Sequence, residues 1–72
     1  MEGIINSRVW SEVATWRATE FQGVAVLQVL VEGVVKGMIA YDPESSPEAI
    51  KGKVMSLAIA IDGIGGEIQV VS

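Results

Sequence analysis

Between Ser46 and Gly66, apolar residues recur at the spacing of a helix. Ser46 can accept hydrogen bonds from the first free backbone N–H groups, and Pro47 suits the first helical position. The residues of the apolar stripe are Ile50, Val54, Leu57, Ile61 and Ile64. The glycines that can end such a helix are Gly63, Gly65 and Gly66. We therefore expect a helix from about Pro47 to Asp62, and a short final strand over Glu67–Val71.

Upstream of this helix, two segments rich in β-branched residues, Val24–Val31 and Val34–Tyr41, flank the dipeptide Glu32-Gly33. This pattern predicts a β-hairpin with a two-residue turn, in which Gly33 supplies a positive φ. The direct register for that turn pairs Val31 with Val34, Val29 with Lys36, Leu27 with Met38 and Ala25 with Ala40. Both faces of the hairpin are mainly apolar, whereas a hairpin with one solvent-exposed face alternates apolar and polar residues. We expect the C-terminal helix to cover one face, and the N-terminal segment or another subunit to cover the other.

The N-terminal segment from Ser7 to Phe21 fits two kinds of element. A helical projection gathers on one side Val9, Trp10, Val13, Ala14, Trp16 and Phe21. That projection favours an amphipathic helix capped by Asn6 or Ser7. Yet Val, Trp and Thr are also good strand residues, and Trp10 and Trp16 would share a face in a strand as well. The expected fold class is α+β, in the order α-β-β-α-β with an antiparallel hairpin packed on a helix, and the alternative order is β-β-β-α-β.

The apolar content is high for a chain of 72 residues without cysteine. Half of the residues are apolar, and a small domain buries only roughly 60% of the surface that its unfolded chain exposes. We expect one small α+β domain over residues 1–72. Because its interior is too small to hide so many apolar side chains, we also expect it to form a homo-oligomer.

Membrane and nucleic-acid partners are not expected. The apolar stretches Val24–Val35 and Val54–Ile64 carry polar interruptions and fall short of the roughly 20 apolar residues of a spanning helix. The N-terminal residues show no basic region ahead of an apolar core, so we expect no secretory signal and a cytoplasmic location. The net charge is −4, and only Lys51 and Lys53 lie close together among the five basic residues. Nucleic-acid binding depends on clustered basic residues that neutralise phosphates.

Catalytic chemistry is poorly represented in the sequence. The chain has no His and no Cys, which removes the commonest general acid–base group and the commonest reactive nucleophile. Asp42, Glu44 and Glu48 fit a turn and a helix start, and they offer too few oxygen ligands for Ca²⁺ or Mg²⁺. The glycines after the helix precede a strand, which is the reverse of a phosphate-binding loop. We expect no catalytic residue, no metal site and no cofactor.

The candidate binding residues in the N-terminal segment are Arg8, Trp10, Trp16 and Arg17. Trp and Arg are the residues that most often anchor interfaces, and Arg over Trp can add a cation–π contact. The alternative is that both Trp residues fill the core and both Arg residues lie at its rim. Met55 and Ile59, one helical turn apart and outside the main stripe, are further candidates, although isolated apolar residues on a surface are common.

These observations favour a small acidic protein-interaction module, homo-oligomeric, that acts by binding as a regulator, adaptor or inhibitor of a partner of unknown identity. The alternative is a small-molecule-binding protein with a pocket at a subunit seam, where the arginines would suit an anionic ligand. An enzyme is the least favoured class.

Overall fold

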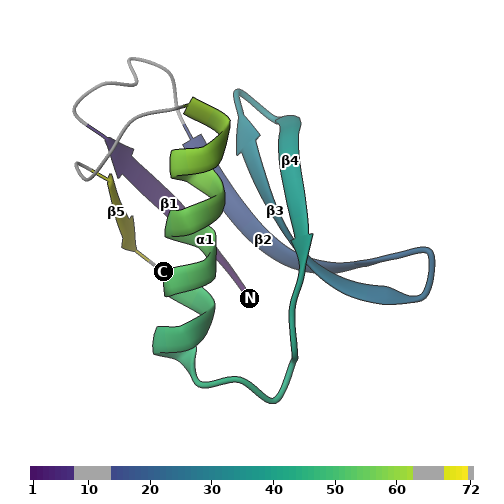
Figure 1. Ribbon diagram of the computed structural model, residues 1–72. Helices are drawn as coiled ribbons and strands as arrows, with labels where there is room; N and C mark the ends of the chain where they lie inside the picture. Colours follow the sequence, from purple (N-terminus) through teal and green to yellow (C-terminus); the bar gives the residue numbers. More distant parts are fainter. Residues whose placement is uncertain (8–13, 63–67, 72) are drawn as a thin grey trace.

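The computed structural model describes residues 1–7, 14–62 and 68–71, which form five strands and one helix in the order β-β-β-β-α-β (Figure 1). The elements are β1 (Glu2–Ser7), β2 (Ala14–Phe21), β3 (Val24–Val31), β4 (Val34–Ala40), α1 (Pro47–Asp62) and β5 (Ile68–Val71). The expected α+β class is confirmed. The order that begins with a helix is wrong, because the chain begins with a strand.

The strands form one antiparallel sheet in the order β4-β3-β2-β1-β5. Strands β2, β3 and β4 follow one another as a meander. Strand β1 lies between β2 and β5, with Ile5 opposite both Ala14 and Val70. The first and last strands of the chain are therefore neighbours, and α1 lies across one face of the sheet (Figure 1).

The segment expected as a helix over Ser7–Phe21 is instead strand β2 where it is described, and residues 8–13 lie outside the described residues. Ala14 and Trp16 are buried while Arg17 is exposed, which is the period of two of a strand. Strand β3 pairs with the whole of β2, and β1 pairs with its first half, Ala14–Arg17, on the other side, so this half has backbone partners along both edges. The alternative order β-β-β-α-β is nearer to the structure but lacks β1.

The expected hairpin forms as β3 and β4, joined by Glu32 and Gly33 with φ values of 51° and 80°. The direct register is confirmed only beside the turn, where Val31 lies opposite Val34. Beyond that point the register shifts by one residue, so that Val29 lies opposite Gly37 and Lys36 forms a β-bulge. The pairings expected beyond the bulge are therefore wrong: Leu27 lies opposite Ile39 instead of Met38, and Ala40 lies opposite Val26 instead of Ala25. Lys36 is likewise not the partner of Val29.

Helix α1 has the expected bounds and begins at the expected cap. Ser46 Oγ accepts a hydrogen bond of 3.2 Å from the backbone N–H of Ala49. On the side facing the sheet, Ile50 and Val54 are buried as expected, and Ala58 is also fully buried although it is absent from the expected stripe. Alanine at this position lets the helix approach the sheet closely. Gly63, Ile64, Gly65 and Gly66 lie outside the described residues.

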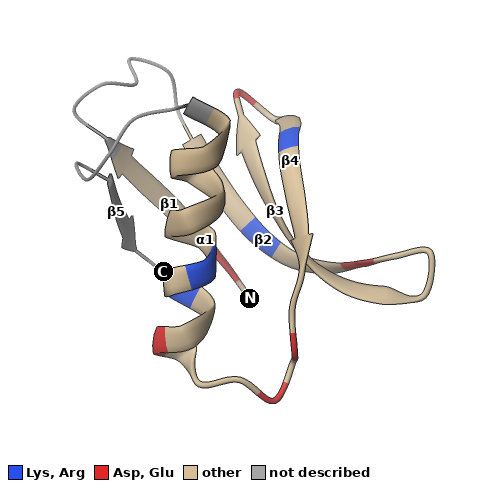
Figure 2. Cartoon of the chain, viewed as in Figure 1, with Lys and Arg blue, Asp and Glu red and all other residues tan. Residues whose placement is uncertain are grey.

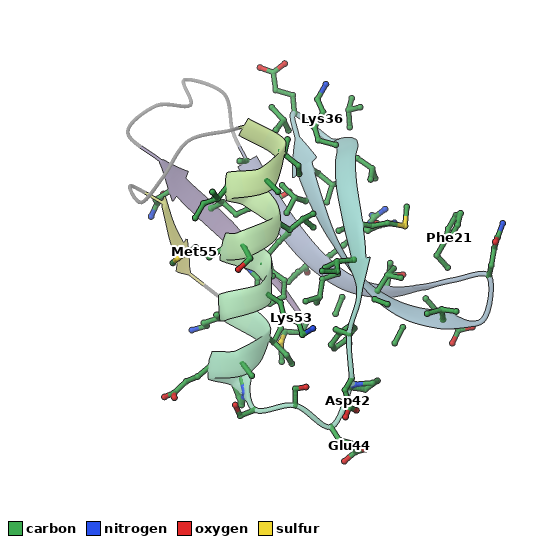
Figure 3. All side chains as sticks on the ribbon, viewed as in Figure 1. Phe21, Lys36, Asp42, Glu44, Lys53 and Met55 are labelled. Atoms are coloured by element: carbon green, nitrogen blue, oxygen red, sulfur yellow. The ribbon has the colours of Figure 1, made fainter. Side chains whose placement is uncertain are left out.

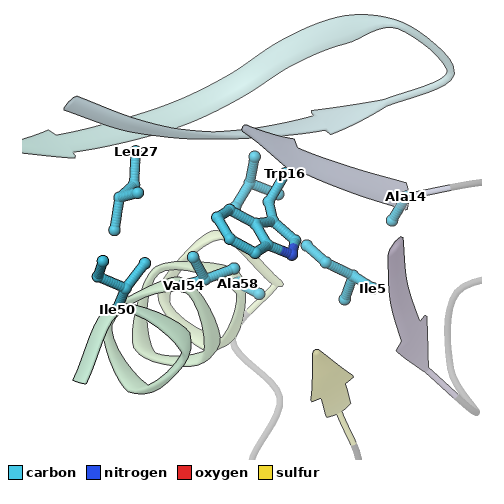
Figure 4. Packing of buried hydrophobic residues seen from close by; sticks show 8 residues of the cluster. Ile5, Ala14, Trp16, Leu27, Ile50, Val54 and Ala58 are labelled. Carbon is cyan, nitrogen blue, oxygen red and sulfur yellow. The ribbon is translucent and has the colours of Figure 1, made fainter. Parts of the chain in front are cut away.

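The core lies between α1 and one face of the sheet (Figure 4). Its buried residues are Ile5, Ala14, Trp16, Leu27, Val29, Ile50, Val54 and Ala58. Trp16 is the largest of them and is only 1% exposed. Within the described residues, its buried indole N–H has no hydrogen-bond acceptor.

Candidate functional site

The other face of the sheet has no described helix or strand packed on it (Figure 1). We call it the open face and define it by strand register, because residues directly opposite each other on paired strands point to the same side. Its residues on β1 to β4 are Glu2, Ile4, Asn6, Thr15, Arg17, Thr19, Phe21, Val24, Val26, Gln28, Leu30, Val35, Met38 and Ala40.

These residues form rows that run across the strands. One row contains Ile4, Thr15, Leu30 and Val35, and the next contains Glu2, Arg17, Gln28 and Met38. The remaining rows contain Thr19, Val26 and Ala40, and then Phe21 and Val24. Asn6 lies beyond Ile4 on β1. The row with Glu2, Arg17 and Gln28 thus lies between two rows that each combine apolar residues with one threonine.

Large apolar side chains of the open face are accessible to solvent. Ile4 is 56% exposed and Val24 is 50% exposed, and Phe21, Val35 and Met38 are each exposed by more than a third. Phe21 lies near the end of the β2–β3 hairpin, which projects beyond the rest of the sheet (Figure 3). Val26 and Leu30 on β3, between these residues, are only 5% and 7% exposed. The exposed apolar side chains therefore lie around the centre of the face, and exposed apolar surface on a small protein can mark an interaction site.

A hydrogen bond fixes the centre of the open face. Arg17 Nε–H donates to Gln28 Oε1 at 2.7 Å. Gln28 is only 6% exposed, whereas Arg17 is exposed. Glu2 on β1 lies opposite Arg17, but the Nε–H of Arg17 donates its hydrogen bond to Gln28 on β3, the other neighbour of β2. The hydrogen bond orients the guanidinium toward β3 and leaves its two Nη groups as further donors.

Acidic residues lie mainly at the ends of elements, away from the open face (Figure 2). Glu32 is in a turn, Asp42 and Glu44 precede α1, and Glu48 is in the first turn of α1. Asp42 Oδ1 accepts a hydrogen bond of 2.9 Å from the backbone N–H of Glu44, as expected for a turn residue. By register, Glu20 belongs to the face that bears α1. Of the described acidic side chains on β1 to β4, Glu2 alone belongs to the open face.

The structure separates the residues expected to form a binding site. Trp16 fills the core, as the alternative to a binding role expects. Arg17 lies on the open face. Met55 and Ile59 are half-buried on α1, and Ile59 packs against the core. Figure 3 shows Met55 on the side of α1 next to β5. Arg8 and Trp10 lie outside the described residues.

The sequence pattern alone did not predict most of the open face. Gln28 lies within a mainly apolar strand, and its hydrogen bond with Arg17 depends on the pairing of β2 with β3, which was not expected. Ile4 was missed because β1 was not expected. The apolar character of both hairpin faces was the one signal that pointed to this surface.

Within residues 1–7, 14–62 and 68–71, the structure brings together no group of three or more carboxylates that could hold a metal ion. In the same part of the chain, no helix has the length and apolar content needed to cross a membrane. Comparison with protein-family models, with curated proteins and with solved structures finds no match to this chain.

Proposed function

We propose that this protein is a small acidic interaction module that binds another protein surface through the open face, and that it does not act by catalysis. The observation that carries the proposal is the open face itself, an apolar sheet surface without a cover among the described elements. The other face already packs against α1 and contains the core. The open face is thus the part of the sheet that remains for a partner.

The composition of the open face supports this proposal. Protein interfaces are enriched in aromatic residues, Met and Arg, and their centres are depleted in Lys, Asp and Glu. The open face contains Phe21, Met38 and Arg17, and Glu2 is its acidic residue on β1 to β4. Arg17 is held in place before binding, which lowers the entropy lost when a partner orders the side chain.

In this proposal, the protein acts by covering a surface of its partner and not by a chemical reaction. A protein without His or Cys lacks the commonest general acid–base group and the commonest reactive nucleophile. Such a module changes the activity or location of its partner by covering or bridging surfaces, as an adaptor, regulator or inhibitor does.

Two matched variants test whether the open face is the binding surface. Val24 and Val34 each begin a strand directly after a two-residue turn, and they are 50% and 57% exposed. Val24 belongs to the open face, whereas Val34 lies on the face that bears α1. We expect Val24→Asp to abolish partner binding, because it places a charge in a desolvated apolar contact. Val34→Asp should leave binding unchanged.

The measurement compares the proteins retained from an extract of the source organism by the wild-type chain and by each variant, together with the mass of each purified chain. Melting curves must first show that the variants fold. A partner, or a second copy, that is lost with Val24→Asp and retained with Val34→Asp supports the proposal. Equal retention by the two variants would contradict it.

A further inference from the structure

We propose that the partner of the open face is a second copy of this chain, packed face to face about a two-fold axis, with Arg17 of each copy against Glu2 of the other. This inference rests on the proposed function and names the occupant of that same surface. It follows from the charge, the area and the edges of the sheet.

The charges of the open face are self-complementary. The chain carries a net charge of −4, yet the open face on β1 to β4 contains one carboxylate, Glu2, and one guanidinium, Arg17. In a two-fold interface, if residue i contacts residue j, then j contacts i. Two copies can therefore form the Arg17–Glu2 contact twice, while the acidic residues in the turns and at the start of α1 stay at the periphery.

The Arg17–Gln28 hydrogen bond prepares this contact. It uses the Nε–H donor and leaves the Nη groups for a carboxylate that approaches from outside the sheet. Glu2 lies beside Arg17 in the same row, so a second open face brings its own Glu2 to the same region. Apolar residues of the neighbouring rows, Leu30 on one side and Val26 on the other, flank Gln28 beside Arg17, and exclusion of water in the dimer would strengthen the attraction of the paired charges.

The area of the open face suits a dimer of two sheets. Strands β1 to β4 have six, eight, eight and seven residues. At about 4.8 Å between strands and about 3.3 Å per residue, they cover roughly 450 Å² of flat sheet. Two such faces amount to roughly 900 Å², which is below the ~1,200–2,000 Å² of standard interfaces and in the range of weak, reversible ones. Two sheets pack face to face at a separation of about 10 Å.

The outer edge of β4 is less suited to a second copy than the open face. A strand can pair with an exposed sheet edge only where the ladder of backbone groups is regular. Strand β4 contains the bulge at Lys36, which interrupts that ladder and places a charged residue at the edge. The bulge therefore favours packing on the face over addition of a strand at β4.

The first test is the mass of the purified chain, measured by sedimentation equilibrium from about 1 to about 100 µM. We expect a dimer for the wild-type chain and for Val34→Asp. For Val24→Asp, we expect the Kd of the dimer to rise by roughly tenfold or more, so that the monomer predominates. A wild-type chain that stays monomeric throughout this range would overturn the inference. The proposed function would then depend on the extract experiment, in which a different protein lost only with Val24→Asp still supports it.

The second test exchanges the charges. Glu2→Arg leaves two positive residues on the open face, and Arg17→Glu leaves two negative ones, so each variant should dimerise more weakly than the wild type. In Arg17→Glu, the Gln28 amide can turn and donate from Nε2, which preserves a local hydrogen bond. An equimolar mixture should recover a heterodimer close to wild-type affinity, because both charge pairs are restored.

Two results of the second test would overturn the proposed arrangement. If the mixture associates no better than the separate variants, Arg17 and Glu2 do not meet across the interface. If Val24→Asp and Val34→Asp weaken the dimer equally, the copies meet through a surface other than the open face. Circular dichroism of each variant establishes that a loss of association is not a loss of fold.

Discussion

A Cβ atom added to Gly37 in β4 would lie 2.9 Å from Ile61 Cδ1 in α1. The same atom would lie 3.4 Å from Leu57 Cδ1. The missing side chain at Gly37 therefore leaves room for the Ile61 side chain against β4. The β-bulge at Lys36 brings this glycine opposite Val29, on the face that bears α1.

Gly37→Val should lower the free energy of unfolding by about 1–3 kcal/mol, because it overpacks the contact with α1. Adding Ile61→Ala should restore part of that loss, although Ile61→Ala is destabilising alone. Urea unfolding of the four chains measures the coupling between the two sites. Strictly additive losses would contradict the contact. Gly52→Ala is a control, because an added Cβ meets nothing within 4 Å there, and it should stabilise the helix by about 1 kcal/mol.

Trp16→Phe should change the free energy of unfolding by less than about 1 kcal/mol, although Trp16 is the largest buried side chain. The substitution leaves a cavity but removes a buried N–H without an acceptor among the described residues, and these effects oppose each other. Trp16→Ala should cost about 3–5 kcal/mol. Denaturant unfolding of both variants provides the comparison. A loss above about 2 kcal/mol for Trp16→Phe would show that the indole N–H is hydrogen-bonded in solution.

Glu32→Asn should stabilise the β3–β4 hairpin by about 0.5–1 kcal/mol. Glu32 and Gly33 both have positive φ, and Asn-Gly suits that turn far better than Glu-Gly. Glu32→Gln removes the same negative charge without this conformational gain. Thermal unfolding should therefore separate the two variants. An equal rise in melting temperature for both would assign the gain to charge instead of turn geometry.

Arg17→Ala should lower stability by about 1 kcal/mol even in the monomer, because Gln28 Oε1 loses its hydrogen-bond donor in a buried position. Replacing both residues, as Arg17→Met with Gln28→Leu, should bring stability back close to that of the wild type. Unfolding measured at low concentration separates this effect from self-association. If the single and double variants are equally stable, the hydrogen bond contributes little to the fold.

Local signals in the sequence were sufficient for the helix and the β3–β4 hairpin. Ser46 and Pro47 mark the start of the helix, and Glu32-Gly33 marks the turn. Both elements form from residues close in sequence, so propensity and periodicity describe them well. The bulge at Lys36 has no comparable local signal, because it depends on how Gly37 fits beneath α1.

The local sequence pattern did not predict the conformation of strand β2 correctly. Its residues fit a helical projection, but the neighbouring strands decide its conformation, because β1 and β3 both supply backbone partners. The same limit applies to the candidate site. Arg17 was identified by its residue type, whereas its partner Gln28 and its neighbour Glu2 become visible only when strand register is known.

The pairing of β1 with β5 joins opposite ends of the sequence, with Ile4 opposite Val71. Closing so long a loop costs more entropy than closing the turns of the β2–β3–β4 meander. We therefore expect the meander to form before β5 docks onto β1. Strand β5 is an edge strand of the described sheet and β3 an interior one, so we expect the backbone amides of β5 to exchange with solvent by local opening and those of β3 only on global unfolding.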